Sequence, residues 1–191
     1  MTYSTTLAGL ALASTALLAG APAFAQQALV PAQSEIAFVS KQMGVPVEGK
    51  FRKFDAQVAF DPAKLATSKI AFTVDTGSAT LGVKETDAEL PKPNWFNVTK
   101  FPQATFQSTA IKSVGAGKYE VAGKLNVKGA TQYVVVPVTL TQSGATTTAA
   151  GSFAIKRLAF KIGENEWADT SMVADEVQVK FKLALTGVPK I

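Results

Sequence analysis

Along most of the chain, apolar and polar residues alternate with a period of two, which is the pattern of β-strands that bury one face. The clearest segment is 174–187, in which apolar residues such as Val177 and Phe181 alternate with Glu, Gln and Lys. Seven further segments fit the same pattern, at 35–41, 47–60, 69–76, 104–112, 118–128, 131–142 and 147–157. The sequence therefore predicts an all-β fold of eight strands.

The segments between these strands carry residues that favour tight turns. Gly115 and Gly117, Lys128-Gly129 and Ser143-Gly144 each predict a hairpin. Strands joined by hairpins run antiparallel, so we expect an antiparallel sheet. Eight such strands can form either a closed barrel or a two-sheet sandwich, and the alternation fits both.

Helical structure is expected only in short pieces. Asp61-Pro62 predicts a helical turn through Leu65, with the aspartate as cap and the proline at the first helical position. Two longer connections, 77–102 and 158–173, interrupt the strands, and Lys84 to Leu90 in the first is expected to form one or two helical turns. Because no linker and no repeat of fixed period divides the chain, we predict one domain.

The N-terminal residues form an apolar run, Leu7 to Ala21, followed by the small-x-small triplet Ala23-Phe24-Ala25. This is the pattern of a secretory signal peptide with its cleavage site. An uncleaved membrane anchor is the alternative, because the first charged residue is Glu35. Small and polar residues dilute the run, so we expect a signal peptide at 1–25 and a single mature domain at 26–191 that is periplasmic or secreted.

The chain has 191 residues and contains neither cysteine nor histidine. These absences exclude disulfides, thiolate and imidazole catalysis, and zinc sites built from cysteine or histidine. The net charge of +5 permits nucleic-acid binding, but the lysines alternate along strands and do not gather in a patch with aromatic residues. We therefore expect no catalytic residues, no metal and no nucleic-acid partner.

Four sequence blocks occur in the order found in a known family. They are Ser40 to Val45 with Val47 to Phe51, Trp95 to Val98 with Phe101 to Phe106, Gly123 to Thr131, and Val173 to Val177. On these blocks the chain resembles the YceI-like family of bacterial secreted, lipocalin-like proteins, often called polyisoprenoid-binding. The resemblance implies an eight-stranded antiparallel barrel around an apolar channel, and non-enzymatic binding of prenyl quinones, polyprenyl chains or other amphipathic lipids. Gln42 stands where many members have histidine, so any head-group contact by that histidine is absent here.

Apolar residues on the predicted strands are the candidates for the wall of such a channel. Each of them also fits a packed core, so the ligand interpretation follows from the resemblance. The strand candidates are Phe38, Phe54, Phe60, Phe72, Phe106, Leu125, Phe153, Ile155 and Phe181. Trp95, Phe96 and Trp167 lie in the long connections, where bulky apolar residues either plug a barrel or form a gate or rim that contacts a ligand.

Three clusters of charge have both a functional and a simpler interpretation. Arg52-Lys53 and Lys156-Arg157 could bind a phosphate head group through the arginine fork, but outward cations that keep a barrel soluble are the simpler expectation. Glu164, Glu166 and Asp169 could be an acidic site, but their spacing lacks the alternating ligands and the glycine of a calcium loop. We expect these carboxylates to be solvated.

Binding, sequestration or transport of an amphipathic isoprenoid or other lipid is thus the expected function, with no cofactor besides that ligand. Two alternatives stay open. One is capture of lipophilic foreign compounds or stress metabolites, and the other is an accessory role in a quinone-using membrane complex. A homodimer and a membrane redox partner are compatible with the sequence.

Overall fold

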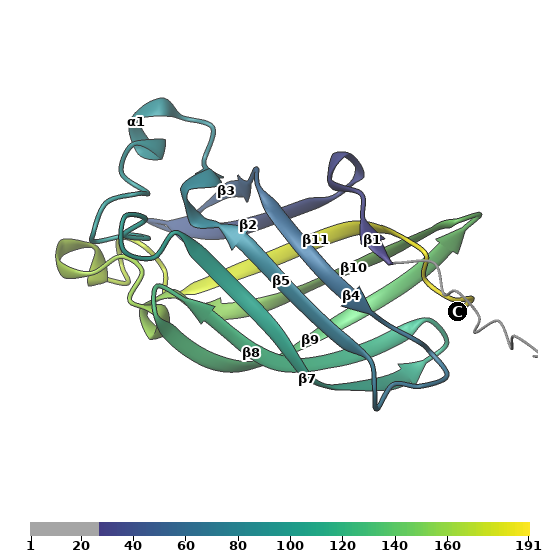
Figure 1. Ribbon diagram of the computed structural model, residues 1–191. Coiled ribbons are helices and arrows are strands. Elements are labelled where there is room, and N and C mark those ends of the chain that lie inside the picture. The colour runs from purple at the N-terminus through teal and green to yellow at the C-terminus, as the bar shows by residue number, and fades with distance from the viewer. Residues whose placement is uncertain (1–26) are drawn as a thin grey trace, which may run out of the picture.

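The computed structural model describes residues 27–191 as a curled antiparallel sheet with short helices in its connections (Figure 1). The predicted signal peptide lies outside the described residues. The strands are β1 (Ala28–Leu29), β2 (Glu35–Gln42), β3 (Val45–Phe51), β4 (Phe54–Ala59), β5 (Lys69–Asp75), β6 (Ala79–Thr80), β7 (Gln103–Gly115), β8 (Lys118–Val127), β9 (Ala130–Ser143), β10 (Thr146–Lys156) and β11 (Glu176–Thr186). The helices are α1 (Lys84–Asp87) and the 3-10 helices η1 (Pro31–Gln33), η2 (Thr76–Ser78), η3 (Arg157–Phe160) and η4 (Asn165–Ala168).

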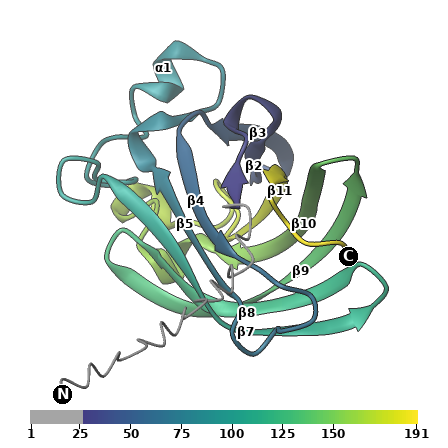
Figure 2. The same ribbon diagram turned by 45° about the vertical axis from the view of Figure 1, so that its right-hand side comes forward.

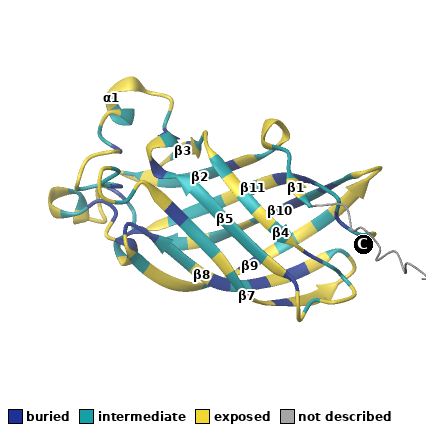
Figure 3. Cartoon of the chain, in the orientation of Figure 1, coloured by how far each residue is buried: buried dark blue, intermediate teal, exposed yellow. Residues whose placement is uncertain are grey.

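Hydrogen bonds place the strands in the order β4-β5-β7-β8-β9-β10-β11-β2-β3-β6, and β1 pairs with β11. All of these pairings are antiparallel. Two views show the sheet curling so that one face turns inward (Figures 1 and 2). Exposed positions alternate along the strands with more buried ones (Figure 3). The predicted antiparallel, lipocalin-like barrel is confirmed, and the sandwich is not formed. The described chain has eleven strands where eight were predicted.

The predicted hairpins join β7 to β8, β8 to β9 and β9 to β10. Their turns contain residues of positive φ, which glycine adopts readily, and Lys128 takes such a conformation with φ of 49°. The β7–β8 and β9–β10 turns lie at one end of the barrel, the hairpin end, and connections 77–102 and 158–173 lie at the opposite end, the loop end (Figure 1).

The helical expectations are met only in part. Asp61-Pro62 opens a hydrogen-bonded turn but no helix: the Lys64 amide donates to the Asp61 carbonyl at 2.9 Å, and the Ala63 amide donates to the Asp61 carboxylate at 2.9 Å. The predicted aspartate cap is present, but the turn does not extend into a helix through Leu65. The next hydrogen bonds, from the Thr67 amide to the Lys64 carbonyl and from the Ser68 amide to the Leu65 carbonyl, form a separate turn before β5 begins at Lys69. In the first long connection, the helix covers Lys84–Asp87, inside the predicted range.

The predicted strand 47–60 is broken, and its two parts pair with different neighbours. β3 lies beside β2, whereas β4 lies beside β5. The inward residues on either side of the break, Phe51 and Phe54, are three positions apart, so the alternation slips by one residue between them. Arg52 and Lys53 are both exposed, and the strand bends there as it does at a β-bulge. The expectation of one continuous strand is wrong for this reason.

This bend brings the two ends of the sheet together, because β3 and β4 are consecutive in the chain. The Arg52 amide donates to the Ser78 carbonyl at 3.1 Å, and the Asp75 amide donates to the Lys53 carbonyl at 3.0 Å. Among the described strands, β4 has no ladder with β1 or β2 on its other side. We call this interrupted part of the barrel wall the seam.

A side chain closes the seam near the hairpin end. The Gln27 Nε2 donates to the Phe60 carbonyl at 2.7 Å, and the Phe60 amide donates to the Gln27 Oε1 at 2.8 Å. The Gln27 amide thus takes the place of a backbone ladder between the chain before β1 and the end of β4. β1 and β6 were not predicted, because strands of two residues are too short to show alternation.

Two apolar clusters make up the core. The cluster toward the hairpin end contains the buried residues Ile36, Phe60, Ile111, Tyr119, Val121, Ala149, Leu183, Leu185 and Val188. The cluster toward the loop end contains the buried residues Ala79, Leu90, Phe96, Ala104, Val127, Phe160 and Ile162. None of the helices between residues 27 and 191 is both long and apolar enough to cross a lipid bilayer.

Candidate ligand cavity

An apolar cavity of about 160 Å³ lies inside the barrel. Strands β2, β4, β5 and β7 to β11 all contribute to its wall, and the surface that this wall presents is apolar. The wall consists of Ile36, Val58, Phe60, Ile70, Phe72, Val74, Phe106, Tyr119, Val121, Leu125, Val136, Val138, Leu140, Thr147, Ala149, Phe153, Val179, Phe181, Leu183, Leu185 and Val188.

Inward aromatic side chains show that the interior is not filled. Phe72, Phe106, Phe153 and Phe181 line the cavity, yet each is only half-buried. In a filled core, inward side chains of this size would be fully buried against their neighbours. The barrel therefore encloses space that its own side chains leave free.

Two glycines on the inner face help to keep that space open. A Cβ atom on Gly123 would lie 2.4 Å from Phe106 Cζ, and one on Gly151 would lie 2.6 Å from Phe181 Cζ. Both rings therefore rest on backbone that carries no side chain. This arrangement places the rings along the barrel wall and leaves the centre free.

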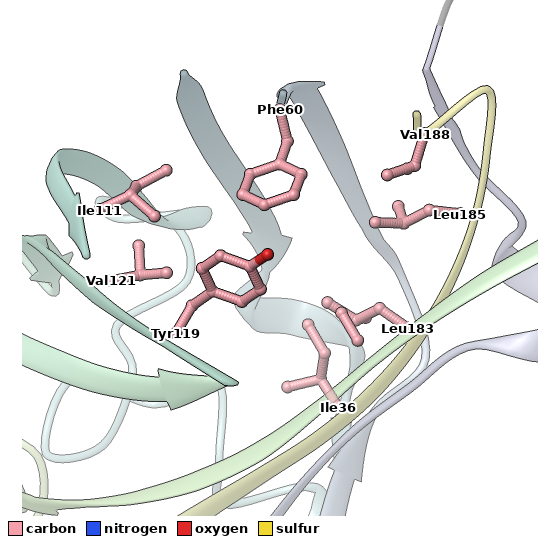
Figure 4. Close-up of a cluster of buried hydrophobic side chains, with 9 residues drawn as sticks. Ile36, Phe60, Ile111, Tyr119, Val121, Leu183, Leu185 and Val188 are labelled. Carbon is pink, nitrogen blue, oxygen red and sulfur yellow. The ribbon is translucent and has the colours of Figure 1, made fainter. Parts of the chain in front are cut away.

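At the hairpin end, the cavity is lined by the residues of the first cluster except Ile111 (Figure 4). The rings of Phe60 and Tyr119 meet edge to face, with centroids 5.2 Å apart. Val188 follows β11, and its carbonyl accepts a hydrogen bond from Gln142 Nε2 at 3.2 Å. The segment after the last strand therefore contributes to the cavity wall.

At the loop end, the two long connections pack against each other. Trp95 from the first and Trp167 from the second have ring centroids 5.4 Å apart. Phe96 and Phe160 are buried in the second core cluster, and Phe160 is 1% exposed. Together Trp95, Trp167, Phe96 and Phe160 cover this end of the barrel, and we call these four residues the stopper.

Arg157 holds the second connection in place. Its side chain is 2% exposed, and all five of its N–H groups donate to backbone carbonyls. The carbonyls belong to Ala174 (3.1 Å), Ile162 (2.8 Å), Gly163 (3.0 Å), Trp167 (2.7 Å) and Val173 (2.7 Å). Burial lowers the pKa of Arg157, against the opposing effect of the Asp175 charge. Neither expectation for this residue is right: it is no outward cation, and it has no donor left for a phosphate.

Lys128 ties the two connections to each other. Its side chain is buried, and Nζ donates to the Pro93 carbonyl at 2.6 Å, the Lys161 carbonyl at 2.6 Å and the Glu164 carboxylate at 2.8 Å. The alternation placed this lysine on an outward position, so it was not a candidate. The sequence carried no signal for this role, because Lys128 lies in the β8–β9 turn, 33 to 36 residues away from each of its three partners.

The acidic residues of the second connection do not converge. Glu164 pairs with Lys128, Glu166 accepts from Asn94 Nδ2 at 3.2 Å, and Asp169 accepts from the Ser171 amide at 2.8 Å. Hydrogen bonds from Ser171 lower the pKa of Asp169. Within residues 27–191, no group of three or more acidic side chains is arranged to hold a metal ion.

The predicted ligand-contacting residues divide into two groups. Six line the cavity, namely Phe60, Phe72, Phe106, Leu125, Phe153 and Phe181. The other six lie outside its wall, namely Phe38, Phe54, Trp95, Phe96, Ile155 and Trp167. Phe38 packs on Phe51 with centroids 5.4 Å apart, and Ile155 packs against the loop-end cluster. The residues of the long connections and Ile155 lie at the loop end, whereas Phe54 packs against the hairpin-end cluster from the edge strand β4. Alternation carries no information about either position.

Comparison with known proteins identifies relatives over most of the described chain. A family model described as "YceI-like domain" matches residues 28–185. A UPF0312 protein of Azotobacter vinelandii is 36% identical over 135 residues, which cover 69% of this chain and 70% of that protein. A UPF0312 protein of Pseudomonas savastanoi is 34% identical over 142 residues, covering 72% and 73%.

Solved structures agree with the fold. BcnA of Burkholderia cenocepacia is 51% identical, with a TM-score of 0.79 over 82% of this chain and 98% of that one. A domain of Saccharophagus degradans described as polyisoprenoid binding has a TM-score of 0.68 at 14% identity, over 84% and 98%, and shows likeness of fold alone. With the apolar cavity and the family match over residues 28–185, the chain belongs to the YceI-like family.

Proposed function

We propose that this protein binds the hydrocarbon tail of an amphipathic isoprenoid, such as a prenyl quinone or polyprenyl chain, or of another lipid, without catalysing a reaction. The observation that carries the proposal is the unfilled, apolar cavity inside the barrel. The description of the Saccharophagus degradans neighbour as a polyisoprenoid-binding domain supports the choice of ligand class. The apolar run before Ala25 supports a role outside the cytoplasm.

The energetics of such binding need no polar chemistry. Each buried methylene group contributes about 0.8 kcal/mol, so ten carbons of a prenyl or acyl tail supply roughly 8 kcal/mol before the cost of ordering. The half-buried rings of the wall become covered when a tail enters, which adds apolar area on the protein side. A ligand of this class thus fills apolar space that the side chains of the barrel leave free.

The first test identifies what the protein carries. Exported protein is purified, extracted with organic solvent and examined by mass spectrometry. A prenyl or acyl lipid in stoichiometric amount supports the proposal. A protein that carries no lipid and binds neither a prenyl alcohol nor a fatty acid in titration contradicts it.

The second test fills the cavity by substitution. Val138 lines the cavity, whereas Val135 on the same strand is 57% exposed, so Val138→Phe and Val135→Phe make the same chemical change on opposite faces. We expect Val138→Phe to weaken binding of a prenyl alcohol at least about tenfold, because a contact loss of about 1.4 kcal/mol gives that factor. Val135→Phe should leave the affinity unchanged. Equal affinities for the two variants would place the ligand outside the barrel.

A further inference from the structure

We propose that a basic cleft on the outside of the seam binds a phosphate-type anionic head group whose hydrocarbon tail occupies the cavity. This inference rests on the proposed function and adds the chemical class of the head group. It assigns a role to Arg52-Lys53, which the bend between β3 and β4 holds at the barrel surface.

The cationic side chains of the cleft all come from one short stretch of chain, residues 50–53. Its lining consists of Pro31, Ser34, Glu35, Lys50, Phe51, Arg52, Lys53 and Phe54. Three cationic side chains therefore face one carboxylate. The one-residue slip at the bend turns two adjacent cations outward, while Lys50 comes from the preceding outward position of β3.

The cations of the cleft are available to a ligand. Lys50 and Lys53 have no carboxylate within 4.0 Å in the part of the chain that the structure describes, and neither does Glu35 have a cationic partner there. Arg52 uses one N–H group, from which it donates to the Thr80 hydroxyl at 3.2 Å. Its charge also acts on Asp87, whose carboxylate accepts from the same hydroxyl, so the two lysines are the freer cations of the cleft. Arg157, by contrast, has all five N–H groups engaged.

The floor of the cleft is a thin part of the barrel wall. Phe51 lies opposite Ile36, and Phe54 lies opposite Val74 in the strand pairings. Ile36 and Val74 both line the cavity, so each aromatic residue of the cleft is the cross-strand neighbour of a cavity residue. Because β4 lacks a ladder with β2 along the seam, no sheet hydrogen bond joins these two strands there, and a passing tail would have to displace the packed side chains of Phe51 and Phe54.

A phosphate matches this lining better than a neutral head group does. Phosphate oxygens accept charge-assisted hydrogen bonds from lysine and arginine, whereas a quinone or alcohol offers no charge. The side chains are exposed, so solvent and salt weaken each contact. Two lysines together should favour the phosphate over the alcohol by about tenfold at low ionic strength.

The test compares three probes by calorimetric titration of the exported protein: a prenyl monophosphate, the prenyl alcohol of the same length, and inorganic phosphate. Three proteins are compared, the wild type, Lys50→Gln/Lys53→Gln, and Lys69→Gln/Lys118→Gln. The last pair removes two exposed lysines at the hairpin end and is the matched control. None of these lysines contacts the cavity.

We expect the wild type and the control to bind the prenyl monophosphate about tenfold more tightly than the alcohol, and Lys50→Gln/Lys53→Gln to lose this preference while keeping its affinity for the alcohol. Inorganic phosphate alone should bind far more weakly than the prenyl monophosphate, because it lacks the tail. Loss of preference in the control would place the head group at the hairpin end and overturn the inference.

Two further outcomes separate the inference from the proposed function. A wild type that binds alcohol and phosphate equally, or inorganic phosphate as tightly as the prenyl monophosphate, overturns the head-group site but leaves tail binding intact. A wild type that binds neither prenyl compound overturns both.

Discussion

Replacing the buried Arg157 with lysine tests how the stopper at the loop end is held. Four of the carbonyls that Arg157 binds belong to connection 158–173, and the fifth belongs to Ala174 directly after it. The other long-range backbone hydrogen bonds of this segment go to Asn94, Lys41 and Met43 near its two ends. Lysine keeps the charge but has three N–H groups, so at least two of the five carbonyls lose their partner. The substitution therefore removes hydrogen bonds without removing the cation.

The magnitude follows from the number of orphaned carbonyls. A buried acceptor without a partner costs about 1–3 kcal/mol, so Arg157→Lys should lower the free energy of unfolding by about 2–6 kcal/mol. Domains of this size are commonly stable by only about 5–15 kcal/mol. The loss is thus large enough to measure and, at its upper end, large enough to unfold the protein.

Urea denaturation measures the loss, and amide hydrogen exchange locates it. In Arg157→Lys, exchange should accelerate in 158–173, whereas the β8–β9 hairpin should stay protected. The matched control is Lys156→Gln, because Lys156 is adjacent but exposed; its effect should stay within about 0.5 kcal/mol. A loss below about 1 kcal/mol in Arg157→Lys, with unchanged exchange in the connection, would refute the proposed role of these hydrogen bonds.

Three further predictions test the cavity, one surface carboxylate and the N-terminus. Phe106→Asp puts a carboxylate on the apolar wall beside Gly123, so it should cost about 3 kcal/mol or more of stability and abolish retention of a lipid, as should Phe72→Asp. Gln107→Asp, on the outer face, is the control and should do neither. A stable Phe106→Asp protein that retains lipid would place the Phe106 side chain outside the site. Hydrogen bonds from the Thr80 hydroxyl and the Leu81 amide lower the pKa of Asp87 below 3.8. The stability that the Asp87 carboxylate contributes is therefore present above pH 3.8 and is lost as the pH falls through the lowered pKa. Asp87→Asn should flatten this part of an acid-unfolding curve, and a curve identical to that of the wild type would contradict the assignment. Cleavage after Ala25 predicts an exported chain of 191 − 25 = 166 residues, and intact mass spectrometry of a full-length membrane-bound chain would disprove the signal peptide.

The alternation of residues determined the strands, because the side-chain period of a strand is a property of the chain itself. It placed Phe72, Phe106 and Phe181 on the inner face, where the structure has them. The slip between Phe51 and Phe54 was also present in the sequence, although its consequence, a bend at which one strand changes neighbours, appears only when both partners are in place.

Only the tertiary structure decided which inward residues face free space and which pack into the ends. Ile155 and Phe153 have the same pattern in sequence, yet Ile155 packs at the loop end and Phe153 lines the cavity. The tertiary structure also decided which arginines are buried and which stay exposed. Arg157 and Arg52 both stand in basic pairs, but Arg157 is buried because the connection that follows it folds back and converges on it with five carbonyls, whereas Arg52 stays at the surface. Alternation is a local property of the chain, whereas burial and convergence depend on which segments the fold brings together.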